Sequence, residues 1–93
     1  MIVGLLNIEI FIPGSASLKE KRMVLKSVKD RAHKKFNVSA AETGYQDKWQ
    51  RSLLGFALVT EKEKYAQEAL NKLFSWLDNE PAFEIVKFNF EFR

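Results

Sequence analysis

Apolar residues recur at two spacings along this chain of 93 residues, and the two spacings predict six elements. Four segments are apolar with an alternation of period two, which is typical of β-strands, and two segments repeat apolar residues every three or four positions, as amphipathic helices do. The elements follow one another as β-α-β-β-α-β. The predicted strands cover residues 2–12, 37–45, 50–60 and 82–92.

Two capping boxes mark where the helices are expected to begin. Ser17 and Glu20 have the required spacing, so the first helix is predicted to start near Leu18. Thr60 and Glu63 predict the start of the second helix. The side of the first helix that is expected to face a core carries Leu18, Val24, Leu25, Val28 and Ala32. The corresponding side of the second helix carries Tyr65, Ala66, Ala69, Leu70, Leu73, Phe74 and Leu77.

The composition of the strands predicts their places in a sheet. Residues 2–12 and 50–60 are apolar on both faces, which favours central positions, whereas residues 37–45 are small and polar on one face, which suits an edge. With right-handed crossovers, this order of elements gives an α+β, ferredoxin-like βαββαβ sandwich, with a four-stranded antiparallel sheet of order 4-1-3-2 and two helices on one face. The last strand changes phase near Ile85–Lys87, which predicts a β-bulge. The whole chain, residues 1–93, is expected to form a single domain.

One face of such a sheet is left uncovered by helices. Val3, Leu5 and Phe11 of the first strand are expected to lie on it. The third strand adds one of two alternating apolar sets, either Leu53, Gly55, Ala57 and Val59 or Leu54, Phe56 and Leu58. Because an exposed apolar face marks an interaction site, we expect a homodimer through this face or through an edge strand.

Positive charge is concentrated in the first helix. The chain has a net charge of +3, but residues 18–35 contain eight basic and two acidic residues, a net charge of +6, so the remainder carries −3. Lys19, Arg22, Lys26, Lys29 and His33 follow at spacings of three and four and form one row along the helix. The row is either a solvated helix face or a surface that binds anions, with RNA phosphate as the favoured ligand.

Composition excludes several classes of site. The chain has no cysteine, which excludes disulfides and thiolate zinc sites, and its single histidine, His33, argues against a histidine-rich metal site. We therefore expect no metal and no cofactor. No apolar run approaches the ~20 residues of a membrane-spanning helix, and the N-terminus lacks the pattern of a signal peptide. A cytoplasmic protein without membrane contact is the corresponding expectation.

Three motifs resemble those of one family of small bacterial proteins. They are SLKEKR at Ser17–Arg22, KKFNVSAAE at Lys34–Glu42 and QDKWQRSLLGFALV at Gln46–Val59, and in this order they are similar to the YlxP-like family, a domain of unknown function. The resemblance implies a ferredoxin-like fold and a cytoplasmic bacterial protein. The family's genes often neighbour those for translation initiation and ribosome maturation, which implies a role close to RNA or the ribosome. The Thr43–Tyr45 segment departs from the family pattern, which more often has an acidic residue near Gly44, so no carboxylate role is expected there.

Proteins of related fold provide two tests of the chemistry. RNA-recognition-motif domains stack bases on aromatic residues of the third strand. Gly55-Phe56-Ala57 fits three positions of that motif, but Leu58 and Thr60 replace its later aromatic residues. Phe56 is therefore expected in the core or in a dimer interface, and any RNA contact is expected on the basic helix. Acylphosphatases need a glycine-rich phosphate cradle after the first strand, which the Pro13–Ser17 segment lacks.

The hairpin between the second and third strands carries the remaining polar candidates. Glu42, Asp47 and Arg51 flank it beside Trp49. Two carboxylates can share acid–base work if their environments separate their pKa values, but a hairpin salt bridge with a Tyr45–Trp49 cross-strand pair accounts for the same residues. No catalytic residue is assigned. The roles of four family-motif residues stay open at this point: Glu42, Asp47, Trp49 and Gln50.

The sequence therefore predicts a non-enzymatic, cytoplasmic protein that contacts RNA or a ribosomal subunit and has no sequence-specific binding to DNA. The candidate nucleic-acid-binding residues are Lys19, Arg22, Lys26, Lys29 and Arg51. The alternative is a homodimeric regulatory module that binds a protein or a small molecule on the uncovered sheet face, and nothing in the sequence selects a ligand for it.

Overall fold

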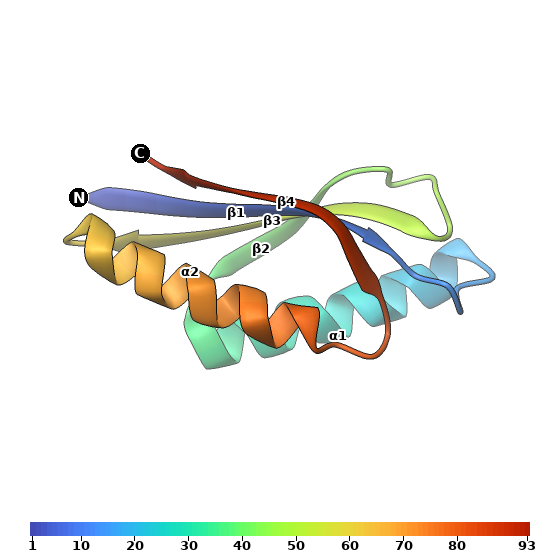
Figure 1. Cartoon of the computed structure of the whole chain (residues 1–93). Helices are drawn as coiled ribbons and strands as arrows, with labels where there is room; N and C mark the ends of the chain where they lie inside the picture. Colours follow the sequence, from blue (N-terminus) through green and yellow to red (C-terminus); the bar gives the residue numbers. More distant parts are fainter.

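The six elements occur in the predicted order, and the two helices lie on the same face of one antiparallel sheet (Figure 1). A computed structural model describes all residues, Met1–Arg93. The elements are β1 (Ile2–Phe11), α1 (Leu18–Phe36), β2 (Ser39–Gly44), β3 (Arg51–Thr60), α2 (Glu63–Asp78) and β4 (Glu84–Phe92). The strand order β2-β3-β1-β4 is the predicted order read from the opposite edge. This α+β arrangement is consistent with the ferredoxin-like fold.

The register of the central strands shows which face the helices cover. β1 pairs with β3 from Ile2 opposite Thr60 to Phe11 opposite Arg51. On the covered face, β1 and β3 bury Leu6, Ile8, Ile10, Leu54, Phe56 and Leu58. The face without helices, called the open face below, therefore carries the other set of β3: Leu53, Gly55, Ala57 and Val59. Phe56 is 1% exposed, so it belongs to the core.

A β-bulge interrupts β4 where the sequence predicted one. Glu9 of β1 pairs with Lys87, but the next residue, Ile10, pairs with Ile85, so Val86 has no partner of its own. In a regular strand, Ile85 would face the side opposite to Phe90 and Phe92. The extra residue changes the phase, so all three side chains pack against the core. The prediction of a bulge near Ile85–Lys87 is confirmed.

The helices close the core through aliphatic side chains. α1 contributes Leu25, Val28 and Ala32, and α2 contributes Ala66, Leu70, Leu73 and Leu77. The prediction that Tyr65 is buried is wrong, because its side chain is 48% exposed. Tyr65 directly precedes Ala66, so it is turned about 100° from the buried side of the helix.

Gly4 in β1 allows α2 to pack closely on the sheet. A Cβ atom at this position would lie 3.1 Å from Leu70 Cδ1 and 3.2 Å from Ala66 Cβ. The second of these atoms belongs to the short side chain of a helix, so it cannot move aside without the helix. A residue with a side chain at position 4 would therefore push α2 away from β1.

The first predicted helix cap is present, but the second is not. Ser17 Oγ accepts a hydrogen bond from the Glu20 amide at 3.1 Å, and Glu20 Oε2 accepts one from the Ala16 amide at 2.6 Å. The prediction of a capping box at Thr60 is wrong, because α2 begins at Glu63 and its N-cap, Lys62, makes no side-chain cap. Thr60 ends β3 instead, and its hydroxyl donates to the Lys62 carbonyl.

The two ends of the chain meet at one end of the sheet (Figure 1). The Val3 amide donates to the Arg93 carbonyl at 2.8 Å, and the Arg93 amide donates to the Val3 carbonyl at 2.9 Å. The β2–β3 loop lies at the opposite end of the molecule in the same view.

Neither helix combines the length and the apolarity needed to cross a membrane.

Candidate nucleic-acid interface

Four of the predicted basic residues form one row on an exposed flank of α1. Lys19, Arg22 and Lys26 are exposed and Lys29 is half-buried. His33 extends the row, and its Nδ1 lies 3.0 Å from the Val38 carbonyl just before β2. The row therefore runs along the flank of α1 that faces the outer edge of β2. Because no strand pairs with the far side of β2, this flank is open to a large partner.

Lys26 and Asp30 form the ion pair within this row. Lys26 Nζ lies 2.8 Å from Asp30 Oδ2, with spacing i,i+4. The hydrogen bond from Lys26 lowers the pKa of Asp30, and the positive charges of Lys26, Lys34 and Lys29 act in the same direction. The hydrogen bond to Asp30 and its negative charge raise the pKa of Lys26. Asp30 therefore offsets one of the four cations of the row, and Lys19, Arg22 and Lys29 make no ion pair.

The opposite flank of α1 is used for packing against α2. Arg31 makes two hydrogen bonds to the carboxylate of Glu80, at 3.0 and 3.2 Å, and its guanidinium lies 5.4 Å from the centroid of the Trp76 ring. Glu80 neutralises this arginine. Available positive charge on α1 is thus concentrated on the β2 side and at the last turn, where Lys34 and Lys35 are exposed.

Lys21 is basic but is not part of the surface. Its side chain is fully buried, and its Nζ lies 2.9 Å from Glu42 Oε2. The same amine donates to the backbone carbonyls of Tyr45 at 2.7 Å, Arg51 at 3.2 Å and Gln46 at 3.4 Å. Since Glu42 neutralises Lys21, the exposed charge of α1 is smaller than the +6 counted along its sequence. The row of Lys19, Arg22, Lys26 and Lys29 is unaffected.

Sequence reasoning missed this buried lysine although a signal was present. Lys21 lies four residues before Leu25, seven before Val28 and eleven before Ala32, which is the spacing of one helix face. It therefore stands in line with the apolar side chains of the core. A lysine at such a position needs a partner within the fold, and Glu42 was one of two family-motif carboxylates, with Asp47, whose role the sequence left open.

The hairpin does not assemble the polar group considered from the sequence. Glu42 points to the covered face, where its carboxylate pairs with Lys21. The Ser52 hydroxyl donates to the same oxygen, Oε2, at 2.7 Å. Arg51 points to the open face and pairs with Glu9 at 2.7 Å. Asp47 makes no ion pair. The expected salt bridge between hairpin residues is therefore replaced by two ion pairs that lead to α1 and to β1.

The aromatic residues of the hairpin are separate from each other. Tyr45 is 38% exposed and Trp49 is 56% exposed, and neither ring takes part in an aromatic pair. Gln50 follows Trp49 and donates through Nε2 to the Pro13 carbonyl at 3.2 Å. Arg51 is not part of the α1 row, because its guanidinium pairs with Glu9 on the open face of the sheet. The five candidate basic residues thus divide into four on α1 and one on the open face.

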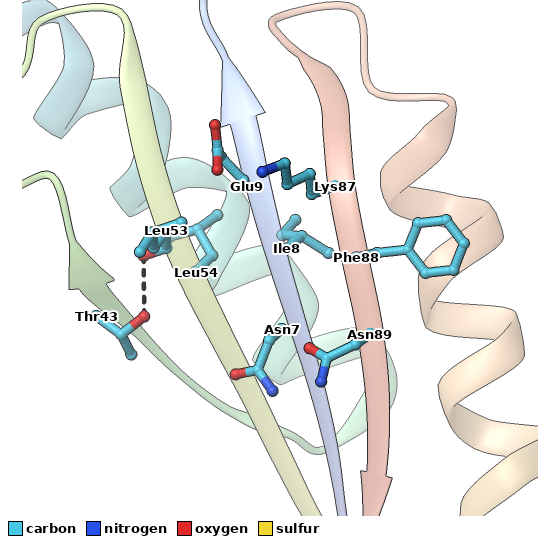
Figure 2. A pocket seen from close by; sticks show the side chains of 9 residues that line it. All are labelled: Asn7, Ile8, Glu9, Thr43, Leu53, Leu54, Lys87, Phe88 and Asn89. Atoms are coloured by element: carbon cyan, nitrogen blue, oxygen red, sulfur yellow. Dashed lines mark hydrogen bonds between the residues drawn. The ribbon is translucent and has the colours of Figure 1, made fainter.

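The open face carries two shallow hollows on either side of Asn7. Figure 2 shows the first, of about 380 Å³, in which Asn7 and Asn89 lie on neighbouring strands and Lys87 extends towards Glu9. The second, of about 290 Å³, lies above the small residues Ala41, Gly55 and Ala57. Phe88 points away from the first hollow towards α2 (Figure 2), where its ring packs against Phe74.

No group of three or more His, Cys, Asp or Glu side chains is placed to hold a metal ion.

Comparison with known proteins identifies the family. Residues 3–90 match the family described as "Protein of unknown function (DUF503)". The chain belongs to this family. The uncharacterized protein YlxP of Bacillus subtilis (strain 168) is 40% identical to it over 83 residues, which are 89% of this chain and 90% of the relative. The resemblance to the YlxP-like family that rested on three motifs is therefore confirmed.

Proposed function

We propose that this protein is a non-enzymatic factor of the bacterial cytoplasm that binds RNA or a ribosomal subunit. The observation that carries the proposal is the row of Lys19, Arg22, Lys26 and Lys29 beside the free edge of β2, in which Asp30 supplies the ion-paired carboxylate. A row of cations with few counter-charges attracts phosphates and releases their counterions on binding.

The mode of binding that fits this surface is contact with the phosphate backbone. The open face of the sheet offers no stacking platform, because the positions of β3 on it are Leu53, Gly55, Ala57 and Val59. Phe56, the aromatic residue of that strand, is in the core. Recognition is thus directed by the shape and charge of the RNA, and no base sequence of DNA is read from a groove.

A charge-reversal variant tests the proposal. We expect Lys19→Glu/Arg22→Glu/Lys26→Glu to abolish co-sedimentation with ribosomal subunits and binding to RNA, while circular dichroism shows the wild-type fold. For the wild-type protein, the logarithm of the binding constant should fall with the logarithm of the salt concentration, with a slope of about −0.7 for each phosphate contact on a single strand.

The matched control carries the same change of charge on α2 and its N-cap. Lys62, Lys64 and Lys72 are all exposed, and reversing all three changes the net charge by the same amount. This control should keep most of the binding. Equal loss in both triple variants would mean that net charge, rather than the α1 row, governs association, and undiminished binding by the α1 variant would exclude the row as the interface.

A second candidate function rests on the open face. Val3, Leu5, Leu53, Ala57 and Val59 form an apolar area there that no helix covers. It supports a homodimeric module that binds a protein or a small molecule. Light scattering at micromolar concentration tests the dimer, which should dissociate in a Leu5→Lys variant. Mass spectrometry of the native protein tests for a bound metabolite in stoichiometric amount. A monomer without such a metabolite would remove this candidate.

A further inference from the structure

A hollow of about 660 Å³ lies where the turn before α1 meets the end of the β2–β3 loop. It is larger than the two hollows of the open face. Its lining comes from the end of β1, the turn and the loop: Phe11, Pro13, Gly14, Ser15, Ala16, Lys48, Trp49, Gln50 and Arg51. The hollow therefore combines an exposed indole with two basic side chains.

Trp49 is the most unusual side chain of this hollow. It is a large apolar side chain in a loop, and 56% of it is exposed. A tryptophan with a free ring face binds planar or apolar partners, and its burial contributes strongly to binding. Lys48, which precedes it, is exposed and makes no ion pair. Arg51 is paired with Glu9 but remains 53% exposed.

The loop that presents Trp49 is fixed at both ends. The buried Lys21 amine holds the carbonyl of Tyr45 at the start of the loop and that of Arg51 at its end. The Gln50 carbonyl accepts from the Ile12 amide at 2.7 Å, and the Gln50 side chain donates to Pro13. Because these contacts order the loop before any partner binds, little conformational entropy is lost on binding.

The loop also contains a backbone conformation that is unfavourable for its residue. Tyr45 has φ +58°, in the left-handed region, and it is not a glycine. The Lys48 amide and the Lys21 amine both donate to the Tyr45 carbonyl, which stabilises this turn. Such conformations persist where surrounding contacts determine them, and they concentrate at binding sites.

We infer that this hollow binds an unpaired nucleotide of RNA, with its base stacked on Trp49 and its phosphate next to Lys48. The inference rests on the proposed function and adds to it the class of RNA, namely single-stranded segments. Ala16 lines the hollow two residues before α1 begins, so the hollow lies next to the N-terminal end of the helix that carries the α1 row. A strand can thus place one base on Trp49 and its next phosphates along α1. In duplex RNA the bases are stacked on one another and are not available to the indole.

The two cations beside the indole favour RNA over a protein segment as the occupant. Bases of any sequence stack on aromatic side chains, and positive charges next to the ring follow the backbone. An acidic peptide would meet the same charges without the planar groups that the indole binds.

The test compares affinities of Trp49→Ala, Trp49→Phe and the wild-type protein for oligouridine, for the same strand with abasic positions, and for duplex RNA of equal length. We expect Trp49→Ala to weaken binding of oligouridine by about 5- to 150-fold, the change that corresponds to one stacked base. Trp49→Phe should retain most of the affinity. The salt dependence should stay unchanged in both variants, because no phosphate contact is lost. Abasic strands and duplex RNA should bind Trp49→Ala and the wild-type protein equally.

The control is Tyr65→Ala, which removes an aromatic side chain of similar exposure on α2. It should bind like the wild-type protein. If Trp49→Ala binds oligouridine as tightly as the wild-type protein does, the hollow is not a nucleotide site, although the α1 row can still bind RNA. If the wild-type protein binds no RNA at low salt, the proposed function and this inference both fail. If oligoglutamate binds at the hollow as tightly as oligouridine and loses affinity in Trp49→Ala, the site belongs to an acidic protein partner.

Discussion

Lys21 and Glu42 form an ion pair between α1 and β2 in which Nζ lies 2.9 Å from Oε2 and the lysine side chain is fully buried. The backbone carbonyls of Tyr45, Gln46 and Arg51 supply the other acceptors of the amine. A buried ammonium is tolerated when its charge is paired and its hydrogens are all donated. The pair joins the first helix to both ends of the loop that carries Trp49.

Replacing Lys21 should destabilise the fold. Lys21→Met keeps much of the side-chain volume but leaves Glu42 without its counter-charge and removes one donor from the loop carbonyls. Since removal of one partner from a buried pair typically costs 3–5 kcal/mol, and Glu42 retains 16% exposure, we expect a loss of about 3 kcal/mol in the free energy of unfolding. Urea denaturation followed by circular dichroism measures it.

The control for this variant is Lys26→Met, which breaks a fully exposed pair and should leave the free energy of unfolding nearly unchanged. In the Lys21→Met background, Glu42→Gln should restore part of the lost stability, because it removes the uncompensated charge. Equal stability of Lys21→Met and Lys26→Met would show that the buried pair does not hold the hairpin.

Gly4→Ala should also destabilise the protein. The added Cβ would lie 3.2 Å from Ala66 Cβ, so α2 has to move away from the sheet, at a cost of about 1–3 kcal/mol. Gly14→Ala is the matched control, because a Cβ there has no atom within 4 Å. It should be neutral or stabilising by up to about 1 kcal/mol through the unfolded chain. In thermal unfolding, the midpoint of Gly4→Ala should be lower than that of the wild-type protein. The midpoint of Gly14→Ala should be equal to it or higher.

Loss of the cap of α1 should lower thermal stability. Ser17→Ala removes the acceptor of the Glu20 amide, which typically costs about 1 kcal/mol and lowers the midpoint by about 4–8 °C in a domain of this size. Ser75→Ala, at an exposed position within α2 where the hydroxyl makes no hydrogen bond, should leave the midpoint nearly unchanged. A drop of the same size in both variants would assign the effect to serine itself rather than to the cap.

The Lys26–Asp30 pair predicts a pH dependence of small size. Because the pKa of Asp30 is lowered in the folded protein, its contribution is present above the unfolded pKa and is lost as the pH falls through the folded pKa. The pKa of Lys26 is raised, so its contribution is lost as the pH rises through the folded pKa. In Lys26→Met, carbon-13 NMR titration should find the Asp30 pKa higher than in the wild-type protein. An unchanged value would mean that Lys34 and Lys29, not Lys26, determine it.

Most of the fold followed from the sequence because its local signals agree with each other. The alternation in β1 and β3, the change of phase at Ile85 and the Ser17 cap each predicted a feature that is present. Thr60 did not follow its pattern, because β3 continues through this residue. α2 starts at Glu63, two residues later than a cap at Thr60 would place its start. Pairing in the sheet prevailed over a local helix signal.

Less of the candidate site followed from the sequence. The row on α1 depends on helical spacing alone, so Lys19, Arg22, Lys26 and Lys29 were placed together correctly. Lys21 and Arg51 depend on tertiary contacts, with Glu42 and Glu9, that lie 21 and 42 residues away along the chain. Charge counting cannot separate such residues from free cations, because it contains no information on distant partners.

The meeting of Val3 and Arg93 determines how the molecule responds to mechanical force. If the chain is pulled by its two ends, the load falls first on the hydrogen-bonded pair between these residues. β1 and β4 are antiparallel, so their bonds then open one after another, as in a zipper, rather than all at once in shear. The sheet should therefore yield at low force from this end, while the hairpin that Lys21 braces stays folded until β1 has been peeled away.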